Sequence, residues 1–536
     1  MPQDLPGFYY DAEKNRYFPI KGPIPGSSRS SSHKSVLKPD QAESLCRRMG
    51  IKASKLLQAR ELYGNVITSS KGKCNFQEEY QKMQASLPMI WKYHGTERIA
   101  DGALEQIYVD IDTPNGLVGT NILLAGGING SLSLYEVGQQ FDNGVKCMPD
   151  RVWPLNIENQ AGCHKVPGHL WRPAQTSIQM RSNISCVRMY GKHSTRTVDD
   201  ASSMQHVLIT TLGSETSGGS INILNLSEPL DYNPSTPLMG RRIYEVTSLN
   251  STVWTADCNS DGSRAVVGTN LGAALVNLET GTPSWVCRCK SDVLSLQLDH
   301  SGNIALCGLR NGAIVTVDTR QKPEEFSARL TRHRIPYPSR GTSEPSSKTA
   351  RNFTKQWFEL KGNINHSYNI YMPSSISCLA SLQLYDQYFL ASSMDGSIKL
   401  YDHRLIQRGA VQSYEGHVNS HTRVQLGVDP LEKFFMSGAY RSFFLPAFRD
   451  LSLCIYVFAL GGEDCNLRFW SIKSGKLLFE HKFMNSVPSI VCWPRIEGLP
   501  EVEDKRQTYR NNQYEENHSS VAWLGSQEGL FYMRWS

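Results

Sequence analysis

Two arginines in this chain stand two residues after an aspartate, each at the end of an alternating apolar segment. The pairs are Asp402 with Arg404 and Asp318 with Arg320. A guanidinium carries five donors in a fixed fork that suits a bidentate carboxylate, and a position just past a strand does not need one for folding. We therefore predict that Arg404 contacts an acidic group on a partner protein. For Arg320 the binding role and an ordinary surface role are equally open, and Asp402 is expected to support its own turn.

Other reactive residue types do not assemble into a predicted catalytic site. Cys163-His164 and Cys287-Arg-Cys289 lack a second ligand pair at metal spacing. The glycine-rich segment 126–130 precedes a predicted strand, whereas a phosphate loop precedes a helix, and no Gly-x-Ser-x-Gly elbow occurs. We expect no enzyme activity, no metal and no cofactor, although a site built from scattered residues would leave no local motif.

The elements that must position the arginines recur along the chain. Each copy is an apolar run, small residues, a turn containing Gly or Asn, and an alternating strand that often ends in an aromatic residue. Seven copies are found, at Leu123–Tyr135, Val207–Leu226, Ala265–Leu278, Ala305–Asp318, Phe389–Asp402, Gly462–Trp470 and Ala522–Trp535. A period of about 40 to 45 residues with several strands per period is typical of WD-type propellers.

We therefore predict an all-β fold in which residues 88–536 form a seven-bladed WD-type β-propeller. The alternative is a pair of β-sandwiches. It is less favoured because β-sandwich sequences do not repeat an Asp-Gly or Asn-Gly dipeptide at the same position before successive strands. Segments 139–180 and 321–373 exceed usual loop lengths and are expected to be long excursions between blades.

One blade departs from the repeat. A WD blade is expected to carry a histidine before it, a serine in its second strand, an aspartate in the next turn and an aromatic residue after that, here His417, Ser437, Asp464 and Trp470. Segment 439–461 lacks repeat spacing and turn signals, which is the pattern expected of a retained intron. Without its 23 residues the 47 positions from His417 to Asp464 become 24, near the usual separation. We predict that this segment is a foreign insertion.

Composition and charge restrict the classes of function. Among 536 residues, 40% are hydrophobic and 20% charged, which is enough for a large core. Residues 1–75 hold 13 basic against 6 acidic residues, and the remainder holds 43 against 44, so a broad nucleic-acid surface is not expected. No apolar run reaches the roughly 18 residues of a membrane span.

The start has no signal-peptide pattern, and the 13 cysteines contain no Cys-x-x-Cys. We expect a chain of the nucleus or cytoplasm that is not secreted.

The basic N-terminal extension, residues 1–75, divides into three parts. Residues 5–18 form an aromatic motif that is expected to be extended, and residues 19–39 form a linker rich in Ser, Pro and Gly. Residues 40–62 are expected to be helical, with apolar positions at Leu45, Met49, Leu56 and Leu57. A solvated helix and a helix that docks in a partner's groove are equally open.

The segment Phe389–Arg404 is the most specific in the chain. It resembles the sixteen-residue box by which WD-repeat receptors of cullin-4 RING ubiquitin ligases engage their adaptor, damaged-DNA-binding protein one. The resemblance rests on a small trio at 391–393, on Asp395 before the turn glycine, on Tyr401-Asp402 and on Arg404, whereas His403 departs from it. A weaker second box ends at Asp318-Thr-Arg320. Segments 5–18, 48–54 and 414–419 also resemble this family.

The resemblance implies a non-catalytic substrate receptor that binds the adaptor and, through it, the cullin-4 RING ligase. It implies adaptor contacts at Arg404, Asp402, Asp395, Arg320 and Asp318, and at the four apolar positions of the N-terminal helix. The substrate protein is not indicated, because propellers build recognition surfaces from scattered loop residues. The alternative is a generic WD-repeat scaffold in a nuclear complex, which would need neither Arg404 nor the N-terminal helix.

Overall fold

The computed structural model describes residues 8–11, 16–19, 85–113, 116–138, 144–154, 166–190, 205–214, 216–230, 238–299, 301–320, 332–336, 357–362, 364, 368–420, 422–438, 465–494 and 521–535. The chain falls into two units, Met1–Lys52 and Ala53–Ser536. In the first unit, strands β1 (Phe8–Asp11) and β2 (Arg16–Pro19) pair antiparallel with Phe8 opposite Pro19. The predicted helical segment 40–62 and insertion 439–461 lie outside the described residues.

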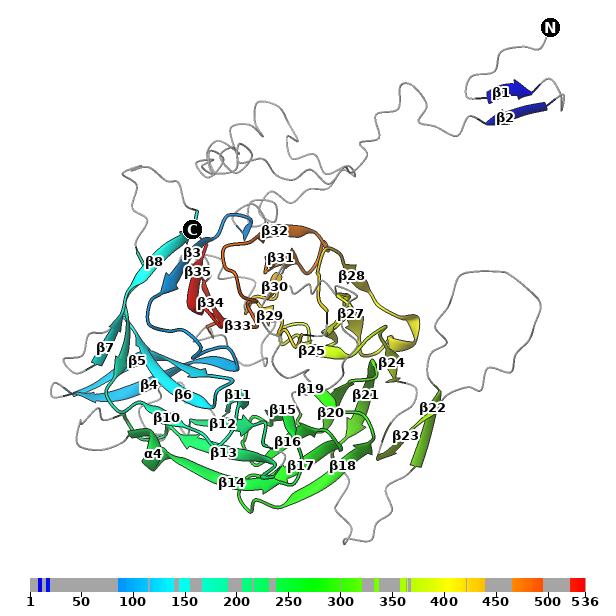
Figure 1. Ribbon diagram of the computed structural model, residues 1–536. Coiled ribbons are helices and arrows are strands. Elements are labelled where there is room, and N and C mark those ends of the chain that lie inside the picture. Colours follow the sequence, from blue (N-terminus) through cyan, green and yellow to red (C-terminus); the bar gives the residue numbers. More distant parts are fainter. Residues whose placement is uncertain are drawn as a thin grey trace, which may run out of the picture. The chain divides into compact units, whose positions relative to one another are not determined.

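The described residues of the second unit form seven antiparallel sheets arranged in a ring, one per blade (Figure 1). Blade 1 consists of β4 (Ala103–Thr113), β5 (Gly116–Gly126), β6 (Ser131–Val137), β9 (Leu170–Pro173), β7 (Gly144–Cys147) and β10 (Ser177–Gln179). Blade 2 consists of β11 (Ile184–Tyr190), β12 (His206–Thr211), β13 (Gly219–Asn225) and β14 (Ile243–Leu249), preceded by the short helix α4 (Leu238–Arg242). Blade 3 consists of β15 (Val253–Cys258), β16 (Arg264–Thr269), β17 (Gly272–Asn277), β18 (Pro283–Cys289), β23 (Trp357–Gly362) and β22 (Arg332–Pro336).

The remaining blades follow in chain order. Blade 4 consists of β19 (Val293–Leu298), β20 (Ile304–Leu309), β21 (Ala313–Asp318) and β24 (Ile370–Tyr371). Blade 5 consists of β25 (Ile376–Ser381), β26 (Tyr388–Ser393), β27 (Ile398–Asp402) and β28 (Gln412–Tyr414), with the 3₁₀ turn η2 (Ile406–Arg408) after β27. Blade 6 consists of β29 (Gly427–Val428), β30 (Phe434–Gly438), β31 (Leu467–Ser471) and β32 (Leu477–His481).

Blade 7 closes the ring with strands from both ends of the second unit. It consists of β33 (Ile490–Cys492), β34 (Val521–Ser526), β35 (Gly529–Arg534), β3 (Met89–Tyr93) and β8 (Pro149–Trp153). Strand β3 pairs with β35 in the register Met89 opposite Arg534. Ladder hydrogen bonds between β3 and β35 therefore hold the first described strand of the unit to its last.

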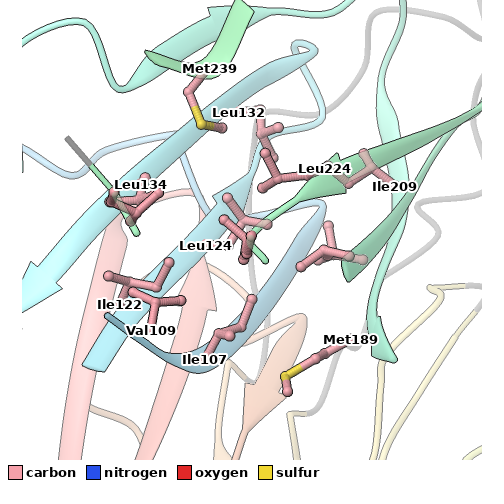
Figure 2. Packing of buried hydrophobic residues seen from close by; sticks show 14 of the residues in the cluster. Ile107, Val109, Ile122, Leu124, Leu132, Leu134, Met189, Ile209, Leu224 and Met239 are labelled. Atoms are coloured by element: carbon pink, nitrogen blue, oxygen red, sulfur yellow. The ribbon is translucent and has the colours of Figure 1, made fainter. Parts of the chain in front are cut away.

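The core lies between neighbouring blades. Strand alternation places apolar side chains on the faces that adjacent blades share. Between blades 1 and 2, for example, Ile107, Ile122 and Leu124 pack with Ile209 and Leu224 (Figure 2). The seven-bladed propeller predicted from the repeat is confirmed, and seven separate sheets in a ring exclude the sandwich pair. Parts of both expected excursions form strands of the blades: β7 to β10 in the first, and β22 to β24 in the second. No helix among the described residues is long and apolar enough to cross a membrane.

Candidate partner-binding site

Arg404 forms a fork-shaped pair with Asp402 just past the end of β27. Its Nε lies 3.0 Å from Asp402 Oδ1, and its Nη2 lies 2.8 Å from Asp402 Oδ2. The backbone N–H of Arg404 also donates to Asp402 Oδ1 at 2.8 Å. The Asp402 side chain is only 3% exposed, whereas that of Arg404 is 66% exposed. The aspartate is thus built into the fold and the guanidinium faces solvent.

Arg320 repeats this arrangement at the end of β21 in blade 4. Its Nε lies 3.0 Å from Asp318 Oδ1, its Nη2 lies 2.6 Å from Asp318 Oδ2, and its backbone N–H donates to Oδ1 at 2.9 Å. The Arg320 side chain is 64% exposed and that of Asp318 is 29% exposed. The two sequence boxes therefore place two equivalent guanidinium groups on adjacent blades.

The pairing has one electrostatic and one geometric consequence. Hydrogen bonds from Arg404 and Arg320 lower the pKa of Asp402 and of Asp318, so both carboxylates are ionised at neutral pH. Side-on pairing through Nε and Nη2 uses one edge of each guanidinium, and the edge that carries Nη1 stays available for a second carboxylate. In the described part of the chain, neither Nη1 has a hydrogen-bond partner. Each aspartate thus holds its arginine in a fixed orientation toward solvent.

Asp395 lies in the turn between β26 and β27 and has a structural contact. Its Oδ1 accepts hydrogen bonds from the backbone N–H of Ser397 at 3.1 Å and from Ser397 Oγ at 2.8 Å. The next residue, Gly396, has φ +87°, and a Cβ there would meet the carbonyl oxygen of His417 at 2.7 Å. Asp395 therefore holds a tight turn that requires glycine, and adaptor contact by Asp395 stays a prediction.

The predicted structural residues of blade 6 come together where they are described. His417 Nε2 lies 2.9 Å from the carbonyl oxygen of Gly438 and 3.1 Å from Ser437 Oγ. The indole N–H of Trp470 donates to the carbonyl oxygen of Glu415 at 2.9 Å. Burial lowers the pKa of His417 to about 4, so the ring is neutral at physiological pH. Asp464 lies outside the described residues.

A hollow of about 1330 Å³ brings the two arginines to one site. Its lining runs from blade 2 to blade 5 and includes Arg188, Arg320, Tyr368, His403 and Arg404. Arg188 comes from β11, and its Nε is buried without a hydrogen-bond partner in the described part of the chain. His403, the residue that departs from the family box, packs on Phe389 with ring centroids 4.6 Å apart.

Sequence reasoning missed the turn that forms part of this lining. The turn between β25 and β26 is held by the carboxylate of Glu432, which belongs to blade 6 and accepts the backbone N–H groups of Gln383, Leu384 and Tyr385. Glu432 itself is 6% exposed and has φ +53°. A glutamate between leucine and lysine carries no local signal for such a contact, because its partners lie in another blade.

Two other predictions concern the site. Leu45, Met49, Leu56 and Leu57, the expected helical anchors, lie outside the described residues, so adaptor docking by that segment stays a prediction. Among the described residues, no group of three or more His, Cys, Asp or Glu side chains is placed to hold a metal ion. The described site therefore presents two oriented guanidinium groups beside a hollow, which can donate hydrogen bonds to acidic groups.

These features define a WD-type β-propeller with a candidate protein-binding face. No protein-family model matches the chain. Along most of its length, however, it is similar to DDB1- and CUL4-associated factor 4 of Homo sapiens, with 22% identity over 483 residues that cover 89% of this chain and 78% of the relative. The Bos taurus protein of the same name is 20% identical over 491 residues, with the same coverage. DDB1- and CUL4-associated factor 4-like protein 2 of Homo sapiens is 28% identical over 145 residues, 26% of this chain and 30% of that protein. The resemblance predicted from the sequence is thereby confirmed.

Proposed function

We propose that this protein is a non-catalytic substrate receptor of a cullin-4 RING ubiquitin ligase. In this proposal the propeller binds the adaptor, damaged-DNA-binding protein one (DDB1), and presents a target protein for ubiquitin transfer by other subunits. The observation that carries the proposal is the pair of equivalent, outward-facing arginines, Arg320 and Arg404, on adjacent blades beside one hollow. The names of the similar proteins associate those relatives with DDB1 and CUL4.

The geometry supports a protein partner that carries acidic groups. Arg404 and Arg320 are fixed by Asp402 and Asp318, so less side-chain entropy is lost when a partner carboxylate binds the free edge of each guanidinium. Two oriented donors on neighbouring blades also fix the angle of a partner. A small anion would need only one of them.

The rest of the proposal extends to parts outside the described residues. We infer that Leu45, Met49, Leu56 and Leu57 add a helical contact to the same adaptor, as helix-in-groove docking uses apolar anchors at such spacing. The place of action is the nucleus, the cytoplasm or both. Nucleic acid is not part of the proposed interface, since the chain beyond residue 75 is close to neutral.

The alternative function is a WD-repeat scaffold in another nuclear complex. A scaffold requires the propeller but not a pair of outward-facing arginines held by aspartates on adjacent blades. Affinity purification of the full chain from cells, read by mass spectrometry, separates the two functions. We expect DDB1 and cullin-4 in stoichiometric amounts with the wild-type chain and their loss with Arg404→Glu. Absence of both from the wild-type sample under mild salt would favour the scaffold.

A further inference from the structure

Large apolar side chains lie exposed around the hollow that the two arginines share. Ile304 and Tyr368 line it and are 38% and 39% exposed. Leu384 and Tyr385 are exposed in the turn between the lining residues Gln383 and Asp386, and Leu405 is exposed directly after Arg404. We call Ile304, Tyr368, Leu384, Tyr385 and Leu405 the apolar rim.

The backbone of the apolar rim in blade 5 is held by hydrogen bonds. Besides the short contact to Gln383, Glu432 accepts the backbone N–H groups of Leu384 at 2.8 Å and Tyr385 at 2.9 Å. The carbonyl oxygen of Tyr385 accepts the N–H of Tyr388 at 2.8 Å, which closes the turn. Leu405 is fixed in the same way, since its N–H donates to the carbonyl oxygen of Asp402 at 3.0 Å. A surface that is already ordered loses little entropy when a partner covers it.

The two arginine pairs by themselves are a weak source of binding free energy. Solvent-exposed ion pairs contribute little on average, and each guanidinium here already has a carboxylate partner. A stable protein complex also buries about 800 Å² on each partner, far more than two arginine tips provide. Exposed tyrosine side chains next to an arginine are, in contrast, typical of the energetic centre of an interface, and exposed leucines beside them add apolar area that a partner can bury.

We propose that the apolar rim seats an apolar segment of the adaptor and supplies most of the binding free energy, while Arg320 and Arg404 orient that segment through acidic residues at its edges. This inference rests on the proposed function, because the adaptor is the occupant. Ile304 and Tyr368 line the same hollow as the two arginines, and the other three rim residues directly follow or precede lining residues in the chain, which is what assigns the rim to the same partner.

The test is a binding titration with purified adaptor in which matched positions outside the site serve as controls. Tyr385, 53% exposed, is matched by Tyr244 on β14, 50% exposed, and Leu405, 42% exposed, is matched by Leu271, 40% exposed. We expect Tyr385→Ser combined with Leu405→Ser to weaken adaptor binding at least tenfold. We expect Tyr244→Ser combined with Leu271→Ser to stay within about twofold of wild type. Thermal melts of both double variants verify that the propeller is folded.

The outcomes distinguish the two proposals. If the wild-type chain binds the adaptor and the rim variant binds equally well, the inference is overturned and the proposed function stands. If Arg404→Ala loses more affinity than the rim variant, the assignment of the binding energy to the rim is wrong. If the wild-type chain does not bind the adaptor at all, the proposed function and the inference both fall.

Discussion

Asp402 acts on the site through Arg404. Its carboxylate accepts three hydrogen bonds from that residue and is almost fully buried. We predict that Asp402→Ala lowers the melting temperature and also weakens adaptor binding, since the backbone N–H loses its acceptor and the guanidinium loses its fixed orientation. Loss of about 1 to 2 kcal/mol of stability is expected for an unsatisfied N–H at such a site. A melt and a titration on the same variant check it, and unchanged values in both would contradict the assigned role.

The same pair gives a pH dependence at the acidic end. Arg404 lowers the pKa of Asp402 in the folded state, so this carboxylate adds stability above its unfolded pKa of about 3.9. That contribution is lost as the pH falls below this value toward the lower folded pKa. The pH range in which the Asp402 contribution changes is therefore separate from the range in which the buried histidine of blade 6 affects stability.

His417 predicts a different pH range. Burial lowers the pKa of His417 to about 4 in the folded state, whereas the pKa of a histidine in the unfolded chain is about 6.5. Between these two pH values the unfolded chain binds a proton at this residue and the folded chain does not. We expect the free energy of unfolding to decrease between pH 6.5 and 4 by at most about 3 kcal/mol from this residue. His417→Gln should flatten the slope of melting temperature against pH in that range relative to wild type. Parallel slopes for the two proteins would show that another group carries the dependence.

At the scale of elements, the hairpins between second and third strands were predictable because their turn signals are local. In the pairs Gly126 with Leu132, Gly308 with Ile314, and Ser392 with Ile398, five residues separate the partners. An Asn or Asp at the third position followed by Gly with positive φ is enough to specify such a turn. The contact of Glu432 with the turn at 383–385 was not predictable, since the partners lie 47 to 49 residues apart and no spacing rule links them.

The register of blade 6 bears on the predicted insertion 439–461. Gly438 pairs with Leu467, so 28 residues separate partners that are separated by five in blades 1, 4 and 5. Removal of the 23 residues leaves five and places Asp464 third in the turn, where the hairpins of blades 1, 4 and 5 have Asn or Asp. We predict that deletion of 439–461 raises soluble yield and melting temperature, because it restores the short turn and removes an apolar segment.

The effect of deleting residues 439–461 must be compared with that of a deletion of similar length elsewhere in the chain. Removal of residues 338–355, which are 18 of the 20 residues between β22 and β23, shortens a long segment to a similar extent without a register argument of this kind and serves as the control. Equal or lower yield of the 439–461 deletion relative to the full chain would count against an insertion.

At the scale of the whole molecule, we expect the N-terminal extension to contribute little to the stability of the propeller and to act together with it in binding. We predict that removal of residues 1–62 weakens adaptor binding and leaves the melting temperature nearly unchanged. Removal of residues 1–93 should instead destabilise the protein strongly, because β3 is the strand that closes blade 7 against β35. Thermal melts and adaptor titrations of both truncations check this. A large loss of stability on removal of 1–62 would show that the extension is structural.

The closed ring could be predicted from the number of sequence repeats, whereas the extra strands at the outer edges of some blades could not. Seven copies of one strand–turn–strand pattern predict seven blades, since each blade buries its faces against its neighbours. Strands β8, β22 and β23 join blades from long segments without repeat spacing, so only the folded structure could assign them. The hollow is likewise a property of the assembled ring, because its lining comes from four blades.

The most direct measurement is a titration of purified adaptor against the wild-type chain and against Arg404→Glu, with a melt of each protein. We predict saturable binding by wild type and its loss or strong reduction in the variant, at an unchanged melting temperature. Arg404 is exposed in the free protein, where substitutions cost within about 0.5 kcal/mol. In the complex, charge reversal places a carboxylate against the acidic group that Arg404 is proposed to meet, and such like-charge contacts cost several kcal/mol. Binding of Arg404→Glu with full affinity would contradict the account and favour the scaffold function.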